Sequence, residues 1–135
     1  MKRKTDGFTT TEIVVGICCV MFLALVGILN APSFMDFGKQ DQARTETAAI
    51  AGYISEYEME VGKYPDSLDK LKDSVGQYGP WLKEIPKDPY ATKNANYQYQ
   101  KNATSFIVFS VGKDGAASSS ITGGIRGDDI GFVSH

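Results

Sequence analysis

The feature that most constrains this chain is a long uncharged stretch near its start. Residues 13–35 contain no Asp, Glu, Lys, Arg or His, and most of them are apolar. At 1.5 Å of rise per residue, about 23 helical residues reach about 35 Å, enough to cross a hydrocarbon core of about 30 Å. We therefore expect an N-terminal helix that can lie in a membrane, with a water-exposed domain after it.

The charges that precede this stretch are unusual. Residues 2–4 are basic, and Glu12 directly precedes the apolar run. A charge inside a bilayer costs roughly 2.5–3.5 kcal/mol on insertion scales and usually needs a partner. A cut between Gly7 and Phe8 would create such a partner, because the free amine of Phe8 is a positive charge at a similar depth.

A short basic leader, Gly7-Phe8-Thr9, Glu12 and a long apolar helix together resemble the class III leader of type IV prepilins. In that family a dedicated membrane peptidase cuts after the glycine and methylates the new amino terminus. The resemblance implies cleavage between Gly7 and Phe8, methylation of Phe8, and a role for Glu12 in assembly.

Two other interpretations of the N-terminus stay open on the residues alone. One is a secretory signal peptide cut near Asn30-Ala31, although its apolar region would exceed the usual 7–15 residues. The other is a plain single-span anchor whose basic residues stay on the cytoplasmic side. Charge asymmetry fits the anchor and the prepilin equally well, so Glu12 is the residue that separates them.

Composition bounds the rest of the chain. The 135 residues leave room for one small domain beyond the anchor. Cys18 and Cys19 are the only cysteines and both lie in the apolar run, so the exported domain has no disulfide to stabilise it. The chain has 14 basic and 16 acidic residues, and losing the basic leader makes the remainder more acidic. This balance argues against nucleic acid as a partner.

A second helical segment is predicted after the apolar run. Pro32 is expected to end or kink the first helix, since proline removes an amide donor and clashes with the preceding turn. Helix should resume after it and run to about Val61, with Gly62 as its stop. One face of this segment is apolar at helical spacing and should pack on the domain: Ile50, Tyr53, Ile54, Tyr57 and Val61.

The remaining elements are shorter. Asp66 or Ser67 is expected to cap a short helix with a buried face formed by Leu68, Leu71 and Val75. Residues 97–99 alternate as a strand does, and residues 106–111 form the strongest strand signal. The C-terminal tail either adds a short strand or packs down as an irregular segment.

The order of these segments resembles the major pseudopilins of type II secretion. In residues 61–130 the long helix ends in Gly-Lys-Tyr-Pro, and a short helix follows. After it come the motif Gly-Pro-Trp-Leu-Lys-Glu-Ile-Pro-Lys-Asp-Pro-Tyr, a strand that contains tyrosines, and the motif Phe-Ser-Val-Gly-Lys-Asp-Gly. The chain departs from the family after Asp88-Pro89, where Tyr90 replaces the usual tryptophan. The fold class implied is α+β and pilin-like, with a long N-terminal helix packed on a small antiparallel sheet and a structured C-terminal loop.

Three aspartates form the one candidate ligand site. Asp114 follows the main strand, and Asp128 and Asp129 lie near the C-terminus. Spacing alone favours a turn and a solvated tail, because the EF-hand pattern is absent. The pseudopilin resemblance instead implies a Ca²⁺ site in this loop, formed by Asp114, Asp128, Asp129 and the backbone of Val111. Such a cation would close the loop onto the sheet in place of a disulfide.

The resemblances together imply a structural filament subunit and no enzyme, since no catalytic constellation is present. The expected domains are a leader (1–7), a transmembrane and assembly helix (8–31) and an extracytoplasmic globular domain (32–135). The implied partners are further copies in a helical filament, the prepilin peptidase and methylase, an assembly platform with its ATPase, minor pilins and membrane lipid. The chain would wait in the inner membrane and then enter a filament. The alternative is a membrane-anchored binding domain that does not polymerise.

Overall fold

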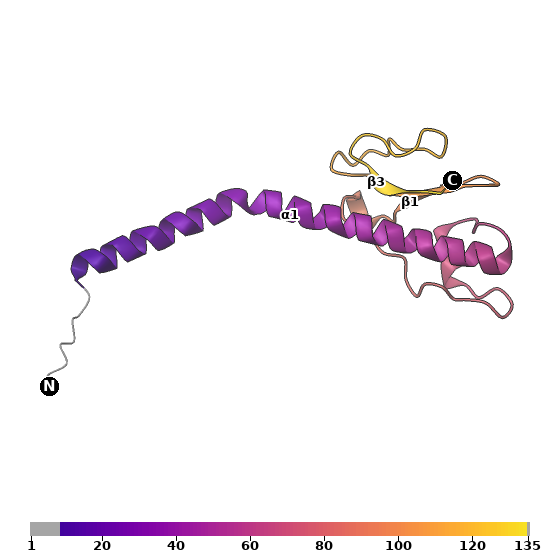
Figure 1. Cartoon of the computed structure of the whole chain (residues 1–135), viewed down its shortest axis with the longest axis horizontal. Coiled ribbons are helices and arrows are strands. Elements are labelled where there is room, and N and C mark those ends of the chain that lie inside the picture. Colours follow the sequence, from indigo (N-terminus) through magenta and orange to yellow (C-terminus); the bar gives the residue numbers. More distant parts are fainter. Residues whose placement is uncertain (1–8, 135) are drawn as a thin grey trace. The chain divides into compact units, whose positions relative to one another are not determined.

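The computed structural model describes residues 9–134, and for residues 30–34 it describes the backbone alone (Figure 1). The elements follow in the order α1 (Thr10–Val61), the 3-10 helices η1 (Leu68–Lys72) and η2 (Thr92–Asn94), β1 (Gln98–Lys101), β2 (Phe106–Ser110) and β3 (Ile130–Val133). The chain divides into two compact units, Met1–Phe37 and Gly38–His135, and each is described by itself. This is the expected α+β pilin-like arrangement.

The backbone of α1 is helical without a break through Pro32, so the prediction that the helix can end there is wrong. Proline removes one amide donor, but the neighbouring helical bonds remain. In an apolar segment the backbone gains most from staying helical, because lipid offers no other hydrogen-bond partners. The predicted stop is confirmed: Gly62 has a φ of +81°, and its N–H donates to the Glu58 carbonyl at 2.8 Å.

The first unit contains one segment, Thr10–Leu29, that is long and apolar enough to cross a membrane. None of it is buried in the part of the chain that the structure describes. Cys18 and Cys19 are free thiols exposed on this segment. Its large side chains are therefore available to lipid or to other apolar surfaces.

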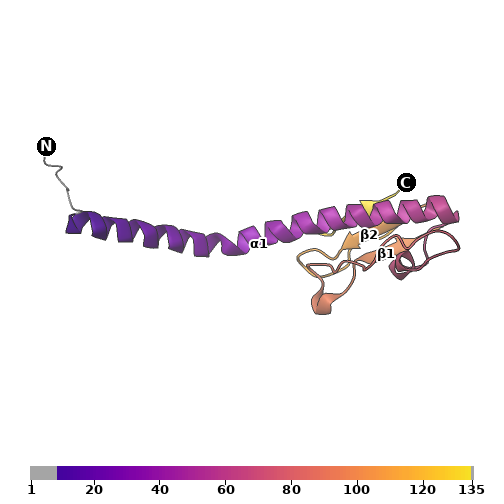
Figure 2. The same ribbon diagram turned by 90° about the horizontal axis from the view of Figure 1, so that it is seen from below.

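The core of the second unit joins the C-terminal half of α1 to the sheet. Ile50, Ile54 and Tyr57 are buried on the helix, as predicted, and Tyr53 and Val61 pack at its edge. They meet side chains from the sheet and its connections: Leu68, Leu71, Ile85, Tyr97, Phe106 and Val108. Figure 2 shows β1 and β2 along this half of the helix.

The sheet has the order β1-β2-β3, and both pairings are antiparallel. Val108 on the central strand pairs with Tyr99 of β1 and with Phe132 of β3. All five residues of β2 are buried, which agrees with its strong strand signal. The tail forms β3, so the strand alternative for the C-terminus is confirmed.

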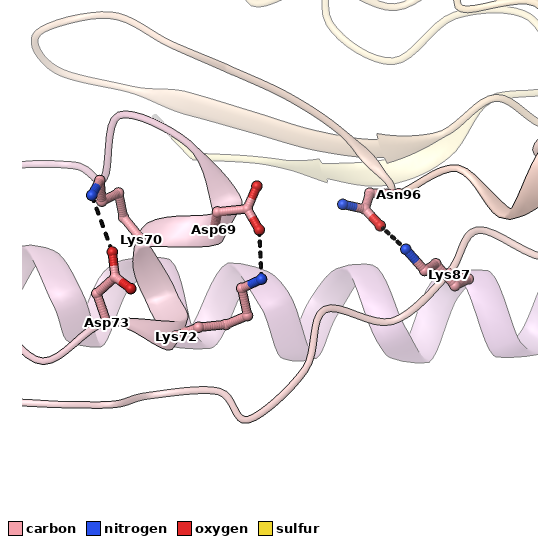
Figure 3. Close-up of polar contacts among 6 residues, drawn as sticks. All are labelled: Asp69, Lys70, Lys72, Asp73, Lys87 and Asn96. Carbon is pink, nitrogen blue, oxygen red and sulfur yellow. Dashed lines mark hydrogen bonds and ion pairs between the residues drawn. The ribbon is translucent and has the colours of Figure 1, made fainter.

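The short helix after α1 differs from its prediction. It is a 3-10 helix of five residues, and within the described residues Ser67 makes no side-chain capping bond. Leu68 and Leu71 are buried as expected, whereas Val75 is exposed. In a 3-10 helix the side chains at i and i+3 eclipse. That geometry suits the two solvent-exposed i,i+3 ion pairs drawn in Figure 3, Asp69–Lys72 and Lys70–Asp73.

Candidate functional site

The C-terminal loop brings together the three aspartates that the sequence singled out. One carboxylate oxygen from each of Asp114, Asp128 and Asp129 lies within 4.8 Å of the other two. Asp114 and Asp128 are exposed, whereas Asp129 is only 6% exposed. The loop therefore folds back on itself, and the solvated-tail interpretation does not describe it.

Backbone amides fix two of these carboxylates. The Asp114 N–H donates to Asp128 Oδ2 at 2.8 Å, and this bond holds the pKa of Asp128 below its usual value. Asp129 Oδ2 accepts from the N–H groups of Ser118 at 2.9 Å and Ser119 at 2.6 Å. Amide donors stabilise the ionised form of a carboxylate, so the loop is built around negative charge.

The other oxygen of Asp129 is the most informative atom of the cluster. Asp129 Oδ1 is buried and has no hydrogen-bond partner among the residues that the structure describes. An unsatisfied buried charged group is costly, and native structures rarely keep one. A cation held by oxygen ligands from an irregular loop would satisfy it, and this donor set matches Ca²⁺ better than a soft metal.

Gly112 connects the end of β2 to this cluster. Its φ is +65°, and a side chain at this position would collide with both the backbone and the carboxyl group of Asp128. The strand end therefore lies directly against Asp128. The part predicted for the Val111 carbonyl, as a further ligand, stays a prediction.

An open groove of about 550 Å³ borders the cluster. Asp128 and Asp129 line one side of it, and the α1 residues Gln40, Arg44 and Thr47 line another. The groove gives an ion from solvent a path to the carboxylates.

Asp88 is a buried acid whose contacts the sequence analysis missed. It is 3% exposed, and it accepts hydrogen bonds from the Ser110 hydroxyl at 2.6 Å, the Val111 N–H at 2.9 Å and the Tyr90 N–H at 2.9 Å. The contact with Tyr90 is an Asx turn, which the Asp-Pro dipeptide signals. The contacts with β2 join positions more than 20 residues apart, and no local pattern predicts them.

At the N-terminal site, the structure gives Glu12 a partner in its own chain. Glu12 Oε2 accepts from the Thr9 N–H at 2.9 Å and from the Thr9 hydroxyl at 3.0 Å, and the Glu12 N–H returns a bond to Thr9 Oγ1 at 3.4 Å. This is a capping box at the start of α1, and the Thr-x-x-Glu spacing could have predicted it. Gly7 and Phe8, the expected cleavage site, lie outside the described residues.

Comparison with known proteins agrees with the pseudopilin resemblance. The model of the family "Type II secretion system (T2SS), protein G" matches residues 32–125. The match includes Asp114 but ends before Asp128 and Asp129.

Curated relatives extend the likeness over more of the chain. The type II secretion system core protein G of Xanthomonas campestris pv. campestris is 31% identical over 117 residues, which cover 81% of this chain and 79% of that protein. The core protein G of Pseudomonas aeruginosa is 29% identical over 127 residues, covering 84% of this chain and 87% of that protein. The Vibrio cholerae protein is 27% identical over 133 residues, covering 90% and 89%.

The family match and the relatives carry the same family name, and each of the three relatives is matched over more than four-fifths of this chain. The chain therefore belongs to the type II secretion system protein G family, the major pseudopilins.

Proposed function

We propose that this chain is cut between Gly7 and Phe8 and polymerises into the pseudopilus of a type II secretion system. The observation that carries the proposal is the exposed apolar segment Thr10–Leu29. Its large apolar side chains are between 41% and 72% exposed, the two limits being Val26 and Leu29. Family membership supports the same function, because the family is one of structural subunits.

Two environments can cover such a segment in turn. Before assembly, lipid accommodates it as a single membrane span. In a filament the same surface packs against the corresponding segments of other copies. A head-to-tail contact that does not close on itself generates an open helix of subunits, which is the geometry of a filament. The prepilin peptidase, an assembly platform with its ATPase, and minor pilins would be the partners of this process.

Glu12 would set the register between copies. In an apolar surrounding an unpaired carboxylate is costly, and the amine of a neighbouring Phe8 would neutralise it. Its capping bonds with Thr9 do not neutralise the charge, since Thr9 supplies only neutral donors. The cap and the intersubunit ion pair are therefore separable roles of one side chain.

Glu12→Gln and Glu12→Ala separate these roles. A glutamine at this position can still complete a capping box but carries no charge. If the ion pair drives assembly, both variants lose filaments when expressed with the secretion machinery and imaged by electron microscopy. Glu56→Ala is the matched control, because Glu56 is an exposed acid on the same helix beyond the apolar segment. Normal filaments from Glu12→Gln would contradict the intersubunit ion pair and leave Glu12 with the capping role alone.

Mass spectrometry of the mature N-terminus tests the processing step. The proposal predicts a chain that begins at a methylated Phe8. A protein that retains residues 1–7 and stays monomeric in detergent would favour the alternative, a membrane-anchored binding domain.

We further propose that the loop binds Ca²⁺ through Asp114, Asp128 and Asp129. The support is the orphaned oxygen of Asp129 together with the convergence of the three carboxylates. A ligand that binds only the folded state stabilises it by about 2.7 kcal/mol at a concentration of 100 Kd. For a domain of this size that corresponds to a rise in the unfolding midpoint on the order of 10 °C.

Thermal unfolding of the detergent-purified chain with excess Ca²⁺ and with chelator tests this site. The midpoint should rise with Ca²⁺ in the wild type and should not respond in Asp129→Asn. Asp41→Asn, an exposed acid on α1, is the control and should keep the full response. Equal unfolding midpoints of the wild type in Ca²⁺ and in chelator would contradict the proposed Ca²⁺ site.

A further inference from the structure

A buried hydrogen-bond relay leads from Asp88 to the start of the cation loop. Asp88 Oδ1 accepts from the Ser110 hydroxyl at 2.6 Å, and the oxygen of that hydroxyl accepts from the Gly112 N–H at 3.3 Å. Asp88 Oδ2 accepts from the Val111 N–H at 2.9 Å. One carboxylate thus holds three consecutive residues at the junction between β2 and the loop.

This junction is where the position of the candidate ligands is set. Gly112 packs against Asp128 so closely that no side chain fits between them. Two residues later, the Asp114 N–H binds Asp128 Oδ2. A shift of the junction would therefore move both Asp114 and the surface on which Asp128 rests.

The relay is buried away from solvent. Asp88 is 3% exposed and Ser110 is fully buried. Two further hydrogen bonds fix Asp88 within its own turn. Its carboxylate accepts from the Tyr90 N–H, and its N–H donates to the Ala95 carbonyl at 3.1 Å. The Asp88 side chain therefore connects the turn around residues 88–95 to the start of the loop, although the two lie far apart in sequence.

We infer that Asp88 and Ser110 are positioning residues for the cation site. This inference rests on the proposed Ca²⁺ binding. Neither residue is a ligand; together they fix the backbone of residues 110–112 so that Asp114 and Asp128 converge before a cation arrives. Groups that hydrogen-bond to metal ligands typically change metal affinity by 10–100-fold when they are removed, and we expect a loss of about this size here.

The test is calorimetric titration of Ca²⁺ into the detergent-purified full chain after chelator treatment. Ser110→Ala should bind Ca²⁺ about 10–100-fold more weakly than the wild type. Its control is Tyr99→Phe, which also deletes one hydroxyl, the donor to the Pro65 carbonyl at 2.9 Å, away from the loop. Ile107→Val controls for general loosening of β2, because Ile107 is fully buried on the same strand. Both controls should keep the wild-type Kd.

The outcomes are distinct. A Ser110→Ala chain that binds Ca²⁺ as the wild type does, while losing unfolding midpoint equally in Ca²⁺ and in chelator, would make the relay merely structural and overturn the inference. An equal loss of affinity in Ile107→Val would overturn it as well. A wild type that shows no Ca²⁺ binding would remove the cation site itself. Asp88→Asn should weaken Ca²⁺ binding in the same direction as Ser110→Ala, and if it does not fold, Ser110→Ala still decides the question.

Discussion

At the scale of single residues, one tyrosine hydroxyl ties α1 to the segment that leads into β1. Tyr97 is 3% exposed and donates to Glu46 Oε2 at 2.6 Å. Burial, and then the hydrogen bond with Glu46, raise the pKa of Tyr97 above its ordinary value. The neutral phenol is thus the form that the folded state requires.

This shift predicts an alkaline loss of stability. Because the folded pKa is raised, the contribution is complete below the unfolded pKa of about 10 and is lost as pH rises above it. The unfolding midpoint of the wild type should fall as pH rises above about 10, and Tyr97→Phe should flatten that fall. Below pH 9 the variant should be less stable by about 0.5–1.5 kcal/mol, the usual net value of one hydrogen bond.

Calorimetry across this pH range at constant ionic strength checks the effect. Tyr53→Phe is the control, since Tyr53 is only half-buried on the same helix. A fall of equal steepness in the wild type and in Tyr97→Phe would contradict the assignment.

At the scale of elements, Leu71 fixes η1 through both its side chain and its carbonyl. Leu71 is fully buried, and its carbonyl accepts from the N–H groups of Trp81 at 2.9 Å and Leu82 at 3.0 Å. Trp81 in turn packs on Tyr57 with ring centroids 4.6 Å apart. The segment after α1 is therefore fastened to the helix through Leu71 and Trp81.

Leu71→Ala should cost 2–5 kcal/mol, the usual range of a buried leucine truncation. Val75→Ala should cost roughly 0.5 kcal/mol or less, because Val75 lies on the surface. Urea unfolding of the two variants in the same detergent measures both values. Equal losses of stability in the two variants would indicate that Val75 lies on the buried face that the sequence predicted.

The contrast between these two residues shows what the sequence could predict. Periodicity located the buried face of α1 and the central strand, because burial of those positions follows directly from spacing. It failed for Val75, since a five-residue 3-10 helix does not carry the i+7 position of an α-helix. The convergence of Asp114 with Asp128 was predicted from the family resemblance. The contact of Asp88 with Ser110 was predicted neither from periodicity nor from the resemblance, because it depends on tertiary packing.

At the scale of the whole molecule, the two compact units divide two tasks. The segment Thr10–Leu29 supplies apolar surface for lipid or for other copies. The unit Gly38–His135 contains the hydrophobic core, the sheet and the aspartate cluster. Polymerisation and folding therefore depend on different parts of one long helix.

This division predicts that residues 38–135 fold alone. The fragment should unfold cooperatively, stay monomeric in the absence of detergent and keep the Ca²⁺ response of the full chain, because it contains the buried positions of the core. A fragment of residues 51–135 is the control. It lacks Ala43, Thr47 and Ile50, all 1% exposed or less, and should lose cooperative unfolding. Circular dichroism and sedimentation velocity give both readouts. A fragment 38–135 that assembles into filaments on its own would contradict the role of the apolar segment, and one that fails to fold would contradict an independent core.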